Sequence, residues 1–141
     1  MNLDGLASRF ALPVKKLQGT DPVETLDLSG KQLGDASAVV IASLIFANGG
    51  LTSLDLSCNA LCITAIADAL RVNGALTSVD LRGNWLGMRE GWGAIFAAIC
   101  GNKDSKIMSM DVSGENISPA GVKLIAEALR TSVTGALMKV R

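Results

Sequence analysis

The stretch that decides the fold is Leu51-Thr52-Ser53-Leu54-Asp55-Leu56-Ser57-Cys58-Asn59-Ala60-Leu61. Its leucines occupy positions 1, 4, 6 and 11 of the stretch, and an asparagine occupies position 9. Successive side chains of a strand point to opposite faces, so Leu54 and Leu56 face a core while Asp55 faces solvent. The amide of Asn59 can bond backbone groups that a bend after the strand leaves free. The stretch therefore predicts a short half-buried strand that ends in a turn held by asparagine.

The same pattern recurs along the chain. Its strand centres are Leu26-Asp27-Leu28, Leu54-Asp55-Leu56, Val79-Asp80-Leu81 and Met110-Asp111-Val112, which follow one another at spacings of 28, 25 and 31 residues. Asn84 repeats the position of Asn59, whereas Lys31 and Glu115 stand there in the outer copies. We expect less regular turns at those two places. Residues 135–141 resemble residues 74–80 and predict the opening of a fifth strand.

The eleven-residue pattern and its spacing resemble the leucine-rich repeats, and units of about 28 residues with a full helix are similar to their ribonuclease-inhibitor-like class. The resemblance covers residues 23–141. It implies an α/β fold, a short horseshoe-shaped solenoid of four repeats plus a partial fifth, with a concave parallel β-sheet and convex helices. It leaves the activity open, because unrelated functions share this scaffold.

Residues 1–22 precede the first repeat. Leu6, Phe10, Val14 and Leu17 fall at helical spacings that Pro13 interrupts, and they predict an N-terminal helical cap over the open end of the sheet. A disordered leader is the alternative. At the other end, residues 135–141 show no polar cap. That end is an edge strand open to self-association, or it continues into further repeats, or another subunit covers it.

Apolar residues at helical spacing follow each strand. Asp35 and Ser118-Pro119 are helix start signals, and Asn48-Gly49-Gly50 and Asn73-Gly74 are stop signals. Gly91 and Gly93 weaken the third helix by about 1 kcal/mol each relative to alanine. The stripes expected to face the core are Ala38, Ile41, Ala42 and Ile45; Ile63, Ile66, Ala67 and Leu70; Trp92, Ile95, Phe96 and Ile99; and Val122, Ile125, Ala126 and Leu129.

Composition narrows the class of protein. The 141 residues fit one domain, and 13 basic residues balance 13 acidic ones. A nucleic-acid surface normally shows as a basic excess, so no nucleic-acid partner is expected. No apolar run approaches the roughly 20 residues of a membrane span, so no membrane partner is expected either. Three cysteines without a pairing framework, and no secretory signal, indicate a reducing, cytoplasmic setting.

Catalytic chemistry has few candidates. The chain contains no histidine and no tyrosine, which excludes Ser-His-Asp and Cys-His arrangements and histidine metal sites. No glycine-rich phosphate loop is present, and Cys58 and Cys62 have no second pair for zinc. We therefore expect neither an enzyme nor a cofactor nor a metal. Cys100 is expected at the buried end of a helix.

Four aspartates at one equivalent strand position form the sharpest surface feature. Neighbouring strands lie about 4.8 Å apart, so these carboxylates should form a row on the concave face. The row is either an acidic stripe for a partner with a basic surface or a hydrated feature common in such repeats. Arg82 interrupts the flanking serines and can neutralise Asp80 or Asp55. The candidate partner-binding residues are Asp27, Asp55, Asp80, Asp111, Ser53, Ser57, Ser78, Arg82 and Trp85.

Trp85 occupies a variable position after Asn84. It is either an exposed anchor for a partner or a side chain folded over the sheet edge. The leading functional hypothesis is a scaffold for protein–protein interaction that uses the concave face and the loops ascending from it. The alternatives are an enzyme regulator, of the GTPase-activating or inhibitor type, which the resemblance implies, and a structural subunit of a large assembly.

Overall fold

The structure is a computed structural model that describes residues 10–61, 63–84 and 91–141. Its strands are β1 (Thr25–Asp27), β2 (Ser53–Asp55), β3 (Ser78–Asp80), β4 (Ser109–Met110) and β5 (Lys139–Val140). Its helices are α1 (Val14–Gln18), α2 (Asp35–Ile45), α3 (Ile63–Leu70), α4 (Gly91–Cys100) and α5 (Pro119–Arg130). The chain is thus a mixed α/β fold in which helices and strands alternate.

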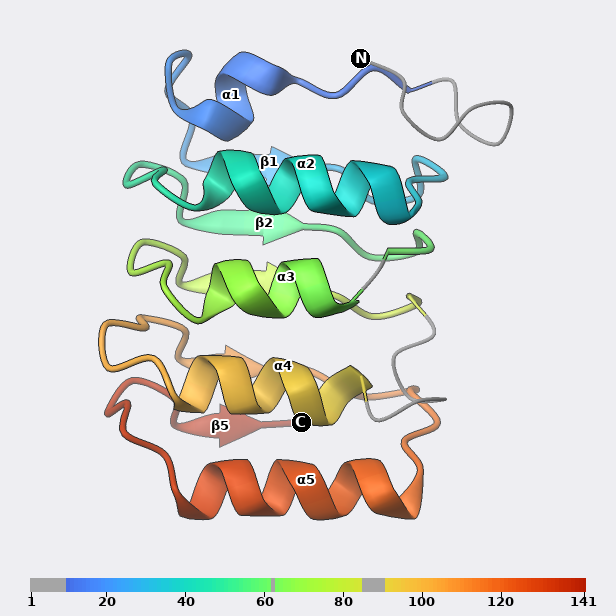
Figure 1. The fold of residues 1–141 in the computed structure, drawn as a ribbon, viewed down its shortest axis with the longest axis vertical. Coiled ribbons are helices and arrows are strands. Elements are labelled where there is room, and N and C mark those ends of the chain that lie inside the picture. The colour runs from blue at the N-terminus through green and yellow to red at the C-terminus, as the bar shows by residue number, and fades with distance from the viewer. Residues whose placement is uncertain (1–9, 62, 85–90) are drawn as a thin grey trace.

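Strands and helices form two layers (Figure 1). The helices α2 to α5 lie one above another in chain order, in front of the strands, and α1 lies over the β1 end. Neighbouring helices contact one another in the same order. A loop and a helix connect each strand to the next one. The chain therefore starts every strand at the same edge of the sheet, and the strands run parallel.

The first three strands share one parallel sheet with the order β1-β2-β3. Leu26 pairs with Leu54, and Leu54 pairs with Val79, which confirms the predicted register for these copies. The fourth copy differs from the prediction of a single continuous sheet. β4 forms a separate two-stranded parallel sheet with β5, in which Met110 pairs with Val140.

At the break between β3 and β4, a backbone bond pattern that opens the earlier strands is missing, although Met138, which also lacks a hydroxyl, still donates its amide to Met108 O before β5. At the start of β2 and of β3, a threonine hydroxyl and two successive amides share one carbonyl of the preceding unit: Thr52 and Ser53 bond Glu24, and Thr77 and Ser78 bond Thr52. Met108 stands at the threonine position before β4 and has no hydroxyl. The preceding loop also makes its own bonds, such as Ser105 N–H to Asn102 O. The chain approaches β4 without forming that carbonyl bridge.

The hydrophobic core lies between the two layers and is built by the repeated positions. The stripes predicted for α2 and α4 are buried, and so are Ile66, Ala67 and Leu70 of α3; the Ile63 side chain lies outside the described residues. Trp92 is fully buried against Phe96, with ring centroids 6.4 Å apart, as expected of a core residue. Each buried large side chain contributes roughly 1.5–3 kcal/mol.

The last helix corrects the prediction. Val122, Ala126 and Leu129 of α5 are exposed and Ile125 is half-buried, so the expected stripe does not face α4. The helix packs instead through Gly121 and Ala128, which are buried. A Cβ on Gly93 of α4 would lie only 2.6 Å from Leu124 Cβ. Glycine in α4 lets these helices approach closely. The α5 stripe is exposed because α5 contacts α4 on one side and no described helix packs on its other side, whereas α3 and α4 each lie between two helices (Figure 1).

The N-terminal end of the stack is covered. Leu12 and Leu17 are buried beside the first unit, and the Asn48 amide nitrogen donates to Lys16 O and Leu17 O at 3.2 and 2.9 Å. Leu6 lies outside the described residues. Among the described helices, none has the length and apolar character to cross a membrane.

Candidate functional site

The candidate site is the face of the strand layer that points away from the helices, here called the sheet face. It is made of the polar strand positions and the residue two places after each aspartate: Thr25, Asp27, Ser29, Ser53, Asp55, Ser57, Ser78, Asp80, Arg82, Ser109, Asp111 and Ser113. All are exposed or half-buried, whereas Leu54, Val79 and Met110 on the opposite side are buried. The strand alternation predicted from the sequence therefore separates a polar face from the core.

The aspartate row has a structural role of its own. Oδ1 of Asp27, of Asp55 and of Asp111 each accepts two hydrogen bonds from the serine two residues later. The serine amide donates at 2.9 Å and the serine hydroxyl at 2.6 Å. This is an aspartate turn, which fixes the bend that follows each strand. The serine hydroxyls are the main cause that lowers the pKa of Asp27 and Asp111. Each carboxylate thus holds its own loop in place while it remains ionised.

Arg82 breaks this pattern, as the sequence indicated, and it pairs with Asp80, one of its two predicted partners, and with Asp111 instead of Asp55. Its guanidinium bonds Asp80 at 2.8 Å and reaches Asp111 Oδ2 at 3.4 Å. The Asp80 hydrogen bond is the main cause that lowers the pKa of that carboxyl and raises the pKa of Arg82. Arg82 therefore bridges the third and fourth strands and leaves Asp55 outside the ion pair. Of the four aspartates, only the last two are neutralised by direct contact with this cation.

The loops that leave the strands are held by buried asparagines. Asn59 Oδ1 accepts the amides of Lys31 and Leu33 in the preceding unit, and its Nδ2 donates to Leu28 O and Leu56 O. Asn84 similarly joins Leu56 O, Leu81 O and the Leu61 amide. These asparagines were expected to serve their own turns. The structure shows that each also ties its turn to the unit before it.

The outer copy replaces this asparagine in another way. Glu115 Oε1 accepts a hydrogen bond from the Gly83 amide at 2.9 Å. Glu115 thus makes one side-chain bond to the preceding unit, whereas Asn59 makes several. Asn116, the next residue in the chain, is exposed. A carboxylate has no N–H donor. Glu115 therefore cannot donate to backbone carbonyls as the Nδ2 atoms of Asn59 and Asn84 do.

A second set of asparagines lies on the opposite edge, and of these the sequence analysis recognised Asn48 and Asn73, only as helix stop signals. Asn48, Asn73 and Asn102 are buried where α2, α3 and α4 end. Asn73 donates to Ile45 O and accepts the Ala75 and Leu76 amides. Their near-even spacing, 25 and 29 residues, is the signal that could have revealed them. Thr134 takes this place after α5, where its hydroxyl bonds Ser105 O and the Ala136 amide.

Cys58 occupies an unusual backbone position beside the sheet face. Its φ is 57°, in the left-handed region, and the equivalent residues Gly30, Gly83 and Gly114 have φ of 60°, 75° and 76°. Glycine adopts this conformation without the steric cost that a side chain meets. The exposed Cys58 is therefore the one non-glycine among the four copies. Cys100, at the end of α4, is buried, and burial raises the pKa of its thiol.

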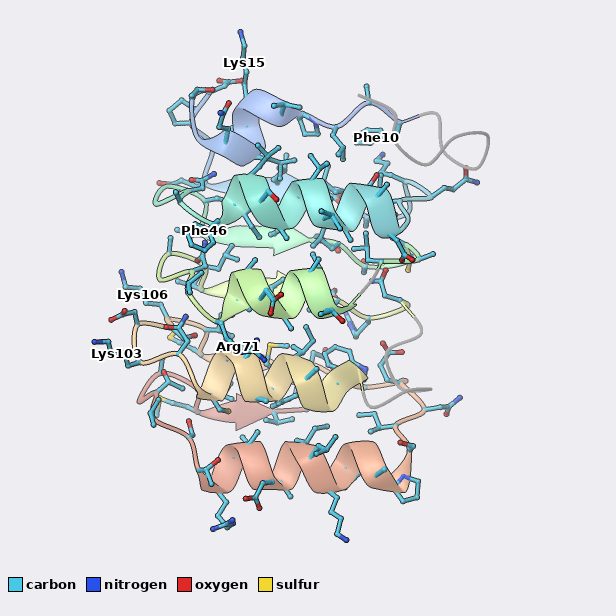
Figure 2. All side chains as sticks on the ribbon, in the orientation of Figure 1. Phe10, Lys15, Phe46, Arg71, Lys103 and Lys106 are labelled. Carbon is cyan, nitrogen blue, oxygen red and sulfur yellow. The ribbon has the colours of Figure 1, made fainter. Side chains whose placement is uncertain are left out.

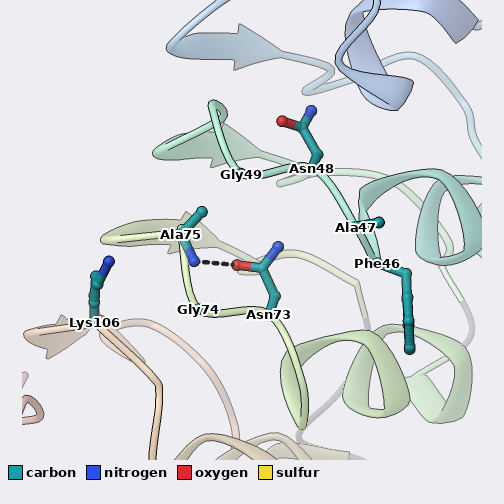
Figure 3. Close-up of a pocket in the computed structure, with 8 residues that line it drawn as sticks. All are labelled: Phe46, Ala47, Asn48, Gly49, Asn73, Gly74, Ala75 and Lys106. Carbon is teal, nitrogen blue, oxygen red and sulfur yellow. Dashed lines mark hydrogen bonds between the residues drawn. The ribbon is translucent and has the colours of Figure 1, made fainter.

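Two shallow hollows lie away from the sheet face. One, of about 320 Å³, is lined by Phe46, Asn48, Asn73 and Lys106 at the edge where helices lead back to strands (Figure 3). The other, of about 260 Å³, lies between α2 and α3 and also includes Phe46. Figure 2 shows Lys103 and Lys106 projecting on this same edge. Trp85, the remaining predicted anchor, lies outside the described residues.

No group of three or more metal-binding side chains occurs among the residues that the structure describes. The sheet face offers carboxylates, hydroxyls and the Arg82 guanidinium bound into ion pairs, and Lys139 and Arg141 extend it over β5 with two further cations. This arrangement can form hydrogen bonds and ion pairs with another molecule.

Comparisons with known proteins give limited results. No family model and no curated protein sequence matches the chain. Among solved structures, the chain is similar to the tropomodulin C-terminal domain of Caenorhabditis elegans, with a TM-score of 0.46 and 10% sequence identity, over 84% of this chain and 89% of that one. A likeness of that degree assigns neither a family nor a function.

Proposed function

We propose that this chain is a leucine-rich-repeat solenoid of the ribonuclease-inhibitor-like class that binds another protein. The binding surface is the sheet face, as the concave side, together with the loops that leave β1 to β4. In-register strands, stacked helices and buried asparagines between units support this assignment. Such arrays offer extended surfaces suited to partner binding.

The observation that carries the proposal is a polar surface that is exposed and already ordered. Thr25, Asp27 and Ser78 are exposed on the strands, and the aspartate turns hold the adjoining loops. Binding is favoured when the free protein already has the bound conformation, because little entropy is lost on association. Every residue that defines this face is exposed or half-buried.

A photocross-linking experiment tests this proposal. A photoreactive amino acid replaces Ser78 on the sheet face, and a matched variant carries it at Ser43, which is exposed on α2 on the opposite side. In native extract, the Ser78 variant should form a discrete adduct that the Ser43 variant lacks. The adduct's protein is then purified, and Ser78→Arg should weaken its binding at least tenfold.

Equal adducts from both positions, or none from Ser78, would remove the sheet face as the binding surface. The identity of a cross-linked protein also decides between a general scaffold, an enzyme regulator and a structural subunit. A cytoplasmic partner is part of the proposal, on the basis of the unpaired cysteines.

A further inference from the structure

We propose that the sheet face binds an extended polypeptide segment in one direction, with the segment's cationic end over β1 and β2 and its anionic end over β4 and β5. This inference rests on the proposed function and specifies the partner. A uniform acidic stripe would fit any basic segment in either direction. The structure instead shows that charge on this face changes along the stack.

The β1–β2 end of the face carries two carboxylates that form no direct ion pair, although Lys31 acts on Asp27 and Arg82 acts on Asp55 at longer range. Asp27 and Asp55 use Oδ1 for their own serines. No ion pair within the described residues involves either of them. Lys31 is the cation that influences Asp27, but its ammonium lies 5.3 Å from the centroid of the Phe10 ring. This end of the face therefore presents unneutralised negative charge.

The opposite end carries cations. Arg82 already neutralises Asp80 and Asp111, at 2.8 and 3.4 Å. Lys139 is exposed and pairs in register with Ser109. Arg141 follows at the place of the aspartates, since its amide bonds Met110 O and its carbonyl accepts the Val112 amide. Over β3 to β5 the face thus holds three cationic side chains and two carboxylates, the reverse of the balance at β1 and β2.

The dimensions of the face suit an extended segment. Five neighbouring strands at about 4.8 Å cover roughly 20 Å, a distance that about six extended residues span. A charge pattern along such a path fixes the direction of binding, because the reversed segment would place like charges together.

A second copy of this chain is a less suitable occupant. Face-to-face pairing of two copies would also match opposite charges. However, a stable dimer buries about 800 Å² per partner around a largely apolar centre. The sheet face is built of serine, threonine, aspartate and cations and offers no apolar centre. Self-association through this face is therefore an outcome that counts against the proposal.

The test uses the whole chain and a defined peptide, Lys-Lys-Gly-Ser-Gly-Glu-Glu. A nitroxide is attached either to its amino end or to its carboxyl end, and amide signals of the protein are recorded at low salt. The label at the lysine end should broaden the amides of residues 25–29 and 53–57 more than those of 139–141, and the label at the glutamate end should do the opposite. High salt should abolish both effects, because it screens exposed charges.

Charge variants test the cause. Asp27→Asn with Asp55→Asn keeps an oxygen for the serine bonds but removes both charges, and it should weaken peptide binding about three- to tenfold. Asp68→Asn with Glu127→Gln is the matched control, because these exposed carboxylates lie on α3 and α5 and pair with arginines there. The control variant should bind the peptide as the unchanged chain does.

Three results would overturn the directional inference: broadening that is equal for both labels, no peptide binding at low salt, or dimerisation of the chain through this face in sedimentation experiments. The proposed function is tested separately, by the cross-linking experiment. If the Ser78 cross-link forms and its partner binds the Asp27→Asn, Asp55→Asn variant unchanged, the direction is wrong and the protein-binding face stands. If the Ser78 adduct is absent, the proposed function itself fails.

Discussion

The first half of the stack and the second half follow one sequence pattern but differ in how their units are joined. From β1 to β3, parallel ladders connect the strands and asparagine side chains link each unit to the one before. From β3 to β5, the sheet is interrupted, and Glu115 and Thr134 stand in place of asparagine. The exposed apolar face of α5 belongs to this second half.

The difference shows that the leucine pattern and the asparagine positions have separate structural roles. Leucine-type residues place strands and helices in both halves, and the hydrophobic core is continuous through α4. The asparagines satisfy buried backbone groups at the bends, which a hydrophobic residue cannot do. Where the amide is replaced, the helices and strands persist but fewer bonds tie the units together.

The largest test of this comparison is the pair Asn59→Ala and Glu115→Ala. Loss of Asn59 leaves buried amides and carbonyls of two units without partners and should reduce the free energy of unfolding by about 3–4 kcal/mol. Loss of Glu115 removes one exposed bond and should cost about 0.5–1 kcal/mol. Urea denaturation measures both; equal losses would show that the two positions do the same work.

The α4–α5 contact tests the packing of helices in the second half of the stack. Gly93→Ala puts a methyl group 2.6 Å from Leu124 Cβ, and it should destabilise the chain by about 1–3 kcal/mol despite alanine's better helix propensity. Adding Leu124→Ala should restore part of this loss. Gly49→Ala, which meets nothing within 4 Å, is the control for the glycine change. Stabilisation by Gly93→Ala alone would contradict the close approach of these helices.

Hydrogen exchange should report the same contrast without mutation. The β2 strand has ladders on both sides, whereas β5 pairs only with β4 among the described strands and is exposed. We expect amides of residues 53–56 to exchange at least about a hundredfold more slowly than the amide of Val140, since local opening at an edge costs little free energy. Equal protection of the two strands would mean that the sheet edge is covered in solution.

Cys58 offers a smaller test, of the loops. Cys58→Gly removes the side chain from a left-handed backbone position that glycine occupies in the other copies. The relief of steric strain should exceed the added flexibility of the unfolded chain and stabilise the protein by about 0.5 kcal/mol. Thermal denaturation under reducing conditions measures it, and a clear loss of stability would show that the Cys58 side chain makes a necessary contact.

An effect of similar size to that of Cys58→Gly concerns pH. The folded-state pKa of Asp80 is lowered, chiefly by its hydrogen bond to Arg82. A lowered carboxyl pKa stabilises the fold above the ordinary pKa of 3.8 and loses that contribution as the pH falls through the folded value. Since the pair is partly exposed to solvent, the contribution is about 0.5–1 kcal/mol. Arg82→Gln should flatten the acid side of the stability–pH curve, measured by urea titration between neutral and acid pH.

Several features of the molecule followed from residue pattern alone. Alternation in Leu54-Asp55-Leu56 and in the first and third copies correctly predicted parallel strands in register, since a one-residue shift would bury the aspartates. Apolar spacing correctly predicted the buried sides of α2 and α4, including Trp92. The position of Arg82 also indicated a partner for Asp80, because two side chains two residues apart on one strand lie on the same face.

Other features depended on distances that no local pattern contains. The stripe of α5 is exposed because no described helix packs on the side of α5 that faces away from α4. The close approach of Leu124 to Gly93 joins residues 31 positions apart. The break after β3 is a feature of strand pairing that the repeated pattern did not predict, and the pairing of Arg82 with Asp111 requires the third and fourth strands to be adjacent. The local sequence pattern of apolar and polar residues thus determined which helices and strands form and which side of most of them is exposed to solvent. Only close packing between units decided how tightly they join and which charges on the sheet face remain without a partner, because both are set by atoms brought together from distant parts of the chain.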